Sequence, residues 1–321
     1  MKLQRLAVAV AGAGMLAATA ASGPAIATTQ GDPTPSWAQK VANAKESAEK
    51  KSASAVAEAC IQSVVWPTAA STVGAADVTA AKPPRAVQYE PLNFVESRYT
   101  ATWYGATNAS GTQDFAYGVF LQDGNLMRHT TTFPEDGAPR ATTAKIGAGW
   151  ASFKSIATSN YQVAAPAHAY LYGLNTNGKL YRYAKSGTGY KNLGNFGGFA
   201  SFKAMTVISE MPTYDTLLMT TKAGALYTIH IPITAAAKPV VKLIQGSGWS
   251  AFESLVTQRC GLRGGTLVVG VDHDTDTGVQ YAFSKANGKA TAITSYGKIP
   301  TVFDGINHAS LTWYKDQLQG E

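Results

Sequence analysis

The sequence predicts an all-β fold, a five-bladed β-propeller of four-stranded blades, preceded by an export signal and one amphipathic helix. A motif rich in glycine and aromatic residues recurs about every 50 residues, and a hairpin-like motif recurs with the same period. Repeats of this length with four strands each are typical of propeller blades, which must pack on neighbours to bury both faces. The last copy stops after two strands, so N-terminal strands can complete a ring. A linear solenoid is the alternative, but the chain shows no distinct capping repeats.

The first element is a predicted signal peptide over residues 1–27. Lys2 and Arg5 precede a weakly apolar run over 6–21, and residues 25–27 (Ala-Ile-Ala) offer a small-x-small cleavage site. An uncleaved membrane anchor is the alternative, less favoured because the run is short and interrupted by glycine. We therefore expect a secreted, extracellular protein with no membrane span after removal of the signal.

Composition supports a folded body after this signal. Of 321 residues, 45% are hydrophobic and 15% charged, which excludes a disordered chain, a coiled coil and a collagen-like fibre. The formal net charge is +7, or +5 without Lys2 and Arg5 of the signal. This mild charge argues against dedicated nucleic-acid binding.

Residues 28–85 are predicted to hold a leader, the amphipathic helix and a linker. Thr34 can cap a helix that starts at Pro35, and the stripe of apolar residues that follows over 36–59 is mostly alanine. From residue 67 to 85 the chain is rich in Ala, Thr and Val and contains two consecutive prolines, which is typical of a linker.

Cys60 and Cys260 are the only cysteines. A pair of cysteines in an exported chain predicts one disulfide, here joining the N-terminal segment to the fourth blade after its first strand. Two buried free thiols are the alternative.

The propeller is predicted over residues 86–321. Its repeated phenylalanines are 49, 50 and 51 residues apart, at Phe153, Phe202, Phe252 and Phe303, and Phe94, 59 residues before Phe153, is a candidate for a degenerate further copy. The blade repeats lie near 94–147, 148–197, 198–247, 248–298 and 299–321, and segments 61–66 and 85–89 are candidates to close the last blade. Hairpins are expected within 116–128, 171–182, 217–227 and 267–281, each around a glycine-containing turn.

At the Gly-x-Gly-Trp-x-x-Phe copies followed by Leu-Tyr-Gly and Gly-x-Leu-Tyr, the chain resembles the tachylectin family over about residues 94–315. The resemblance implies a five-bladed propeller that binds N-acetylated amino sugars between blades. It assigns carbohydrate binding to the glycine and aromatic pairs Gly149 and Trp150, Gly198 and Phe199, and Gly248 and Trp249. Two copies keep one glycine of the family's Gly-Gly before Trp, and the third has Phe199 in place of Trp.

These aromatic residues have two possible roles. A sugar can stack its apolar CH faces on Trp or Phe while exposed peptide groups meet its hydroxyls or acetamide. Alternatively, the rings wedge neighbouring blades together, and each glycine serves only the tight turn.

Catalytic and metal motifs are largely missing from the sequence. No His-Glu-x-x-His, Gly-x-Ser-x-Gly or phosphate loop occurs. His129 is expected to be a strand residue, and His308 could face the central channel. The acidic stretch 272–278 is interpreted as a solvated hairpin tip rather than a calcium loop, because no Glu follows at the required offset.

These observations favour a secreted, lectin-like protein without catalysis, cofactor or metal, whose partners are glycans bearing N-acetylated amino sugars. A propeller with a protein partner on its ring face is the alternative, and a secreted hydrolase is less favoured because no repeat carries a convincing acid/base pair.

Overall fold

The computed structural model describes residues 60–70, 72–93, 99–100, 104–107, 113–134, 140–234, 238–261, 265–304 and 317–321. The predicted signal peptide, the helix over 36–59, Phe94 and His308 lie outside these residues. No helix within the described ranges is long and apolar enough to cross a membrane.

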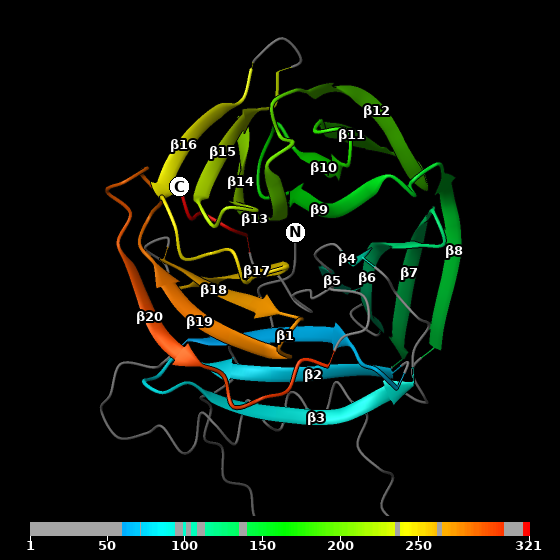
Figure 1. Cartoon of the computed structure of the whole chain (residues 1–321). Helices are drawn as coiled ribbons and strands as arrows, with labels where there is room; N and C mark the ends of the chain where they lie inside the picture. The colour runs from blue at the N-terminus through cyan, green and yellow to red at the C-terminus, as the bar shows by residue number, and fades with distance from the viewer. Residues whose placement is uncertain are drawn as a thin grey trace, which may run out of the picture.

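Five antiparallel sheets stand around a central axis (Figure 1). We name these sheets blades A to E in chain order. Blade A contains β1 (Ile61–Pro67), β2 (Thr72–Thr79) and β3 (Arg85–Asn93); blade B contains β4 (Tyr99–Thr100), β5 (Tyr104–Thr107), β6 (Gln113–Gln122), β7 (Asn125–Pro134) and β8 (Arg140–Ala148). Blade C contains β9 (Phe153–Tyr161), β10 (His168–Asn175), β11 (Leu180–Ser186) and β12 (Gly189–Phe196); blade D contains β13 (Phe202–Met211), β14 (Tyr214–Thr221), β15 (Leu226–Pro232) and β16 (Val240–Gln245). Blade E contains β17 (Ser254–Cys260), β18 (Gly265–Asp272), β19 (Thr277–Phe283) and β20 (Ile293–Lys298).

The predicted five-bladed, all-β propeller is thereby confirmed. Blades C, D and E each have four strands paired in chain order, and the four predicted hairpins form β6–β7, β10–β11, β14–β15 and β18–β19. In blade B, β4 and β5 pair with successive stretches of β6 and share the inner position. Blade A has three strands within the described residues.

The N-terminal region contributes more to the ring than the sequence predicted. Segments 61–66 and 85–89 are strands, as proposed, but they pair with a strand between them, β2. The interpretation of residues 67–85 as a linker was therefore wrong. Six of the eight residues of β2 are buried, and a strand with both faces covered lacks the polar–apolar alternation that identifies an exposed one.

The hydrophobic core lies between blades rather than inside each one. Each core cluster collects side chains from two neighbouring sheets, such as Val119 of blade B with Ile156 of blade C. In blades C and E the repeated Phe stands at or just before the start of the inner strand, and its ring lies over a glycine of the next strand. A Cβ atom on Gly173 or Gly270 would come within 2.7 Å of the ring of Phe153 or Phe252, so the ring requires the missing side chain.

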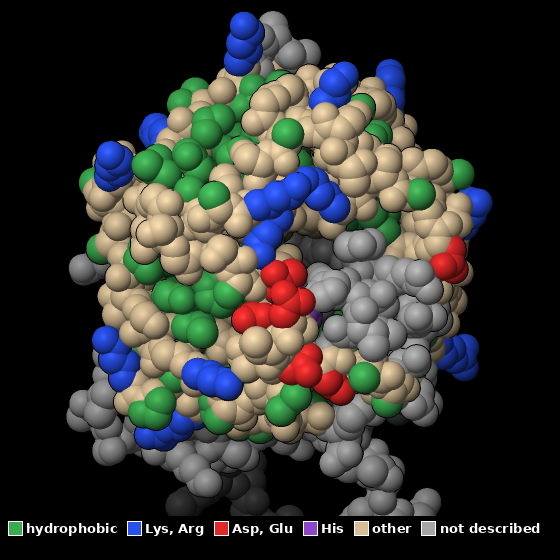
Figure 2. All heavy atoms as spheres, viewed as in Figure 1, with side chains coloured by type: hydrophobic (Ala, Val, Ile, Leu, Met, Phe, Trp, Pro, Cys, Tyr) green, Lys and Arg blue, Asp and Glu red, His purple; other side chains and the backbone are tan. Residues whose placement is uncertain are grey.

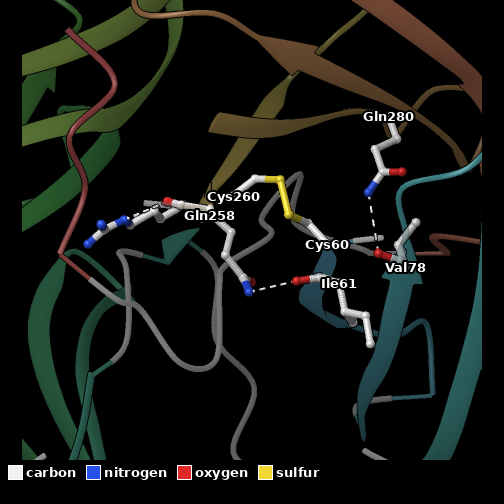
Figure 3. Close-up of a disulfide and its surroundings, with 8 residues drawn as sticks. Cys60, Ile61, Val78, Gln258, Cys260 and Gln280 are labelled. Carbon is white, nitrogen blue, oxygen red and sulfur yellow. Dashed lines mark hydrogen bonds between the residues drawn. A yellow bond between two sulfur atoms is a disulfide. The ribbon is translucent and has the colours of Figure 1, made fainter. Parts of the chain in front are cut away.

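The ring closes between blades E and A, where the two ends of the repeat array meet. Gln62 Nε2 donates to Val256 O at 2.8 Å. Gln258 Nε2 donates to Ile61 O at 2.7 Å, as Figure 3 shows. Beside these bonds, Cys60 and Cys260 form the predicted disulfide, which is confirmed. Cys260 ends the first strand of blade E, so the covalent link joins the two sheets directly.

Candidate functional site

Three of the predicted site residues begin a new blade and bond back to the previous one. In each case the backbone N–H of the aromatic residue donates to the carbonyl of a hairpin-turn glycine: Trp150 to Gly124 at 2.8 Å, Phe199 to Gly178 at 2.9 Å, and Trp249 to Gly224 at 3.0 Å. The fourth copy makes the same bond, from Ile299 to Gly278 at 2.8 Å. The repeat thus joins blade B to C, C to D and D to E through the same hydrogen bond to a hairpin turn.

The three aromatic rings are buried between blades. Trp150 is 7% exposed, Phe199 3% and Trp249 2%. The Trp249 ring centroid lies 4.7 Å from that of Tyr281 and 5.5 Å from that of Phe252. This burial favours the packing role, in which the rings wedge adjacent blades together.

The glycines beside these rings are exposed to open space. Gly149, Gly198 and Gly248 have φ of 81°, 91° and 98°, a left-handed backbone that side chains rarely adopt. A Cβ atom on Gly149 or Gly198 would meet no other atom within 4 Å. At these junctions the peptide backbone, rather than the aromatic ring, is what a ligand could reach.

A pocket of about 150 Å³ lies between blades B and C, and its lining residues include none of the three buried aromatic residues Trp150, Phe199 and Trp249. Strands β5 to β8 form one side, and β9 to β12 with the β11–β12 turn form the other. Its lining residues are Tyr104, Tyr117, Gly118, Val119, Arg128, Ile146, Thr158, Ser159, Asn160, Ala169, Lys185, Gly187, Thr188, Gly189 and Tyr190. The lining mixes aromatic rings, amide and hydroxyl groups and exposed turn backbone.

Tyrosines supply the aromatic part of this pocket. The ring centroids of Tyr104 and Tyr117 are 5.9 Å apart, and the Tyr104 hydroxyl donates to Thr158 O across the two blades at 2.8 Å. Burial raises the pKa of Tyr117, and burial raises that of Tyr190 to about 12. Both phenols are therefore neutral at pH 7 and can donate hydrogen bonds.

Buried carboxylates lie behind this wall rather than in it. Glu210 and Asp215 are 1% and 0% exposed. Glu210 accepts a hydrogen bond from Asn160 N at 2.9 Å, and Asp215 accepts one from His168 Nε2 at 2.9 Å. Their oxygens already have partners, so they hold the blades together and do not form an acid/base pair facing a ligand.

A second group of charges gathers near the middle of one face of the ring. Figure 2 shows Lys or Arg side chains next to Asp or Glu side chains there. The ion pair between Lys203 and Glu253 has an N–O distance of 2.8 Å, and ligand atoms of Glu253, Asp272 and Asp274 lie within 4.8 Å of one another. Glu253 accepts hydrogen bonds from Lys203 Nζ and His273 N, and Asp272 accepts them from Asp274 N and Thr275 N. Two of the three carboxylates are therefore engaged with protein donors. The interpretation of 272–278 as a hairpin tip agrees with the exposure of residues 274–276.

The pocket residues were missed in the sequence because they follow no repeat motif. Tyr117 lies in a repeated hairpin, but Thr216 holds the corresponding place in blade D. The available signal was local: residues 186–190 (Ser-Gly-Thr-Gly-Tyr) form a glycine-rich turn followed by an aromatic residue. His129, by contrast, was placed correctly on a strand, β7.

When the chain is compared with known proteins, similarity is found to solved structures. No family model matches the chain, and no curated protein matches it. A point mutant of the Aleuria aurantia lectin, in complex with Fucα1-6GlcNAc, is similar at 12% identity and a TM-score of 0.42, covering 76% of this chain and 80% of that one.

Two other similar structures have different activities. The catalytic domain of a Coprinopsis cinerea GH62 α-L-arabinofuranosidase has 11% identity and a TM-score of 0.44, covering 68% of this chain and 74% of that one. The SapL1 lectin in complex with α-methyl fucoside has 12% identity and a TM-score of 0.40, covering 74% and 81%. Similarity at this level carries no argument about function, and the propeller fold rests on the strand pairing of this chain.

Proposed function

We propose that this protein is a secreted, lectin-like protein that binds N-acetylated amino sugars of glycans or cell walls. The pocket between blades B and C carries the proposal, because it combines tyrosine rings with exposed peptide and amide groups in a space for one small ligand. Apolar CH faces of a sugar pack on such rings, while hydroxyl and acetamide groups bond to the peptide. An inter-blade site of this kind also agrees with the resemblance to the tachylectin family.

We propose binding without catalysis. Glycoside hydrolysis generally needs two carboxylates flanking the scissile bond, and the described residues that line this pocket include no carboxylate. The disulfide between Cys60 and Cys260 supports a secreted, oxidising location, since such links persist mainly outside the cytosol.

The glycine and aromatic junctions are proposed as weaker, additional sites. Their left-handed glycines, Gly149, Gly198 and Gly248, offer exposed backbone to a hydroxyl or acetamide. Several weak sites on one ring would raise the avidity for a repeating glycan.

Titration of the folded protein with chitotriose tests this function. We expect the wild type to bind, and Tyr117→Ala to weaken binding by about tenfold through loss of a stacking face. Tyr296→Ala on β20, outside the pocket, is the matched control and should bind as the wild type does.

A parallel titration of Trp150→Ala distinguishes the two kinds of site. Unchanged affinity with a lower melting temperature would assign the indole to packing alone. No chitotriose binding by the folded wild type would reject the lectin function and leave the protein-interaction propeller as the better hypothesis.

A further inference from the structure

The charged side chains that line the pocket between blades B and C are all positive among the described residues. Arg128 and Lys185 are the only charged side chains among the described residues that line it. Within the described part of the chain, neither forms a salt bridge. A cation without a paired carboxylate is available to an anionic group on a ligand.

Both cations are held at the pocket by neighbouring groups. Arg128 Nη1 donates to Thr188 O, on the turn that rims the pocket, at 3.4 Å. Lys185 Nζ lies 5.8 Å from the ring centroid of Tyr117, within the range of a cation–π contact. The two charges therefore approach the same space from β7 and β11, on opposite sides of the junction.

The corresponding junction two blades further on already holds a carboxylate. There, residues 317–321 contact β13, β14, β15 and β16 of blade D, together with β18 and the β19–β20 connection of blade E. These elements are the counterparts of β5 to β8, β10 and the β11–β12 turn, which surround the open pocket.

The acidic group in that junction is Glu321. Its carboxylate accepts a hydrogen bond from the Thr216 hydroxyl, lies 2.7 Å from His230 Nδ1 and has Lys242 Nζ at 4.0 Å. The fold thus accommodates a carboxylate between two blades, with basic side chains beside it.

We propose that the open pocket binds a sugar that carries both an N-acetyl group and a carboxylate, with the carboxylate paired to Arg128 and Lys185. The proposal rests on the proposed function and narrows its ligand class. A space of about 150 Å³ suits one sugar ring better than an extended acidic peptide, and Tyr117 offers that ring a packing face.

A matched pair of sugars tests the carboxylate directly. N-acetylmuramic acid is N-acetylglucosamine with an added lactic acid ether, so the two differ by the acidic group. In calorimetric titrations of the whole protein we expect the acid to bind about tenfold tighter, as one charge-assisted hydrogen bond provides. The preference should shrink at high salt, and the neutral carboxamide of the same sugar should bind like N-acetylglucosamine.

Substitutions at the two basic residues test whether they cause the preference for the acidic sugar. Arg128→Gln and Lys185→Gln should each reduce severalfold the ratio between the affinity for N-acetylmuramic acid and the affinity for N-acetylglucosamine, measured on the same variant. Lys191→Gln, on β12 and outside the pocket lining, is the control for a change in overall charge and should keep the preference.

The outcomes separate this proposal from the proposed function. Equal affinity for the acid, its carboxamide and N-acetylglucosamine would overturn the carboxylate assignment and leave the lectin function standing. Absence of binding to all three sugars would overturn both. Binding of the acidic pentapeptide Gln-Leu-Gln-Gly-Glu to the pocket, without binding of the sugars, would identify a peptide groove and overturn both as well.

Discussion

Single buried polar residues join neighbouring blades. Asp215 of blade D is fully buried and accepts hydrogen bonds from three side chains of blade C: Ser159 at 2.5 Å, Tyr172 at 2.7 Å and His168 at 2.9 Å. Burial and the nearby Asp215 raise the pKa of Tyr172 well above its ordinary value, so the phenol stays a donor. Removing Asp215 would take the shared acceptor from all three donors, which makes such a network specific to this packing.

His129 is a second buried polar residue, and it links stability to pH. Its ring nitrogens lie 2.9 Å from Thr143 Oγ1 and 2.9 Å from Thr131 Oγ1. Burial lowers its pKa from 6.5 to about 4. Between these values the unfolded chain binds a proton that the folded chain does not, so the free energy of unfolding must fall as the pH falls through this window.

We expect this loss to reach up to about 3 kcal/mol between pH 6.5 and pH 4, from the size of the pKa shift. Urea unfolding of the wild type and of His129→Gln, which cannot titrate here, measures it. The variant should show a flatter pH dependence over this window. Identical slopes in both proteins would assign the acid sensitivity to other groups.

At the scale of strands and turns, four junctions of the described chain, from blade B round to blade A, repeat one arrangement with small changes. A residue that begins a blade bonds to the preceding hairpin turn, and its side chain packs into the cluster between the two sheets. At the fourth junction Ile299 takes the place of the aromatic residue, and the Trp66 and Phe303 rings, with centroids 4.7 Å apart, fill the space.

Replacing a wedge should therefore weaken the fold. Trp249→Ala should lower the free energy of unfolding by about 3–5 kcal/mol, the usual cost of removing a buried aromatic ring. Denaturant unfolding checks this value. Val163→Ala, at a side chain that is 71% exposed, is the control, and an equally small effect of both substitutions would contradict the wedge role.

The repeat made the blades and their hairpins predictable, because Phe and Gly recur in register with the strands they pack between. The same pattern could not identify β2, whose residues are almost all buried. Nor could it assign the roles of Trp150 and Trp249, since a stacking platform and a wedge require the same residue types. The pocket was beyond prediction for another reason: it combines residues from eight strands and one turn, including Tyr104 and Tyr190, that only the ring brings together.

Over the whole molecule, the closure between blades E and A differs from the other junctions because its two sheets come from distant parts of the chain. The disulfide spans a sequence separation of 200 residues. Side-chain amides reinforce it: Gln280 Nε2 donates to Val78 O at 3.4 Å (Figure 3).

The double substitution Cys60→Ser and Cys260→Ser should reduce stability by roughly 2–5 kcal/mol, because a long loop gains entropy in the unfolded chain once the link is removed. Melting temperatures with and without reductant measure the effect. The wild type should melt lower with reductant, and the double variant should not respond to it. A wild type that melts at the same temperature in both conditions would show that the hydrogen bonds and packing hold the ring without the link.

Because the ring is closed by the first sheet of the chain, blade A can reach its final packing only after blade E has been made. During synthesis blade A is made before every other blade, yet its inner strand β1 packs against β17, the inner strand of blade E. Contacts of such sequence separation form slowly. Until β17 is available, the face of β1 that will meet it has no neighbour, and an uncovered sheet face favours aggregation. Of all the strands, the N-terminal ones therefore spend the longest time without their packing partner. The disulfide between Cys60 and Cys260 can form only after β1 and β17 have come together, so its formation marks the closure of the ring.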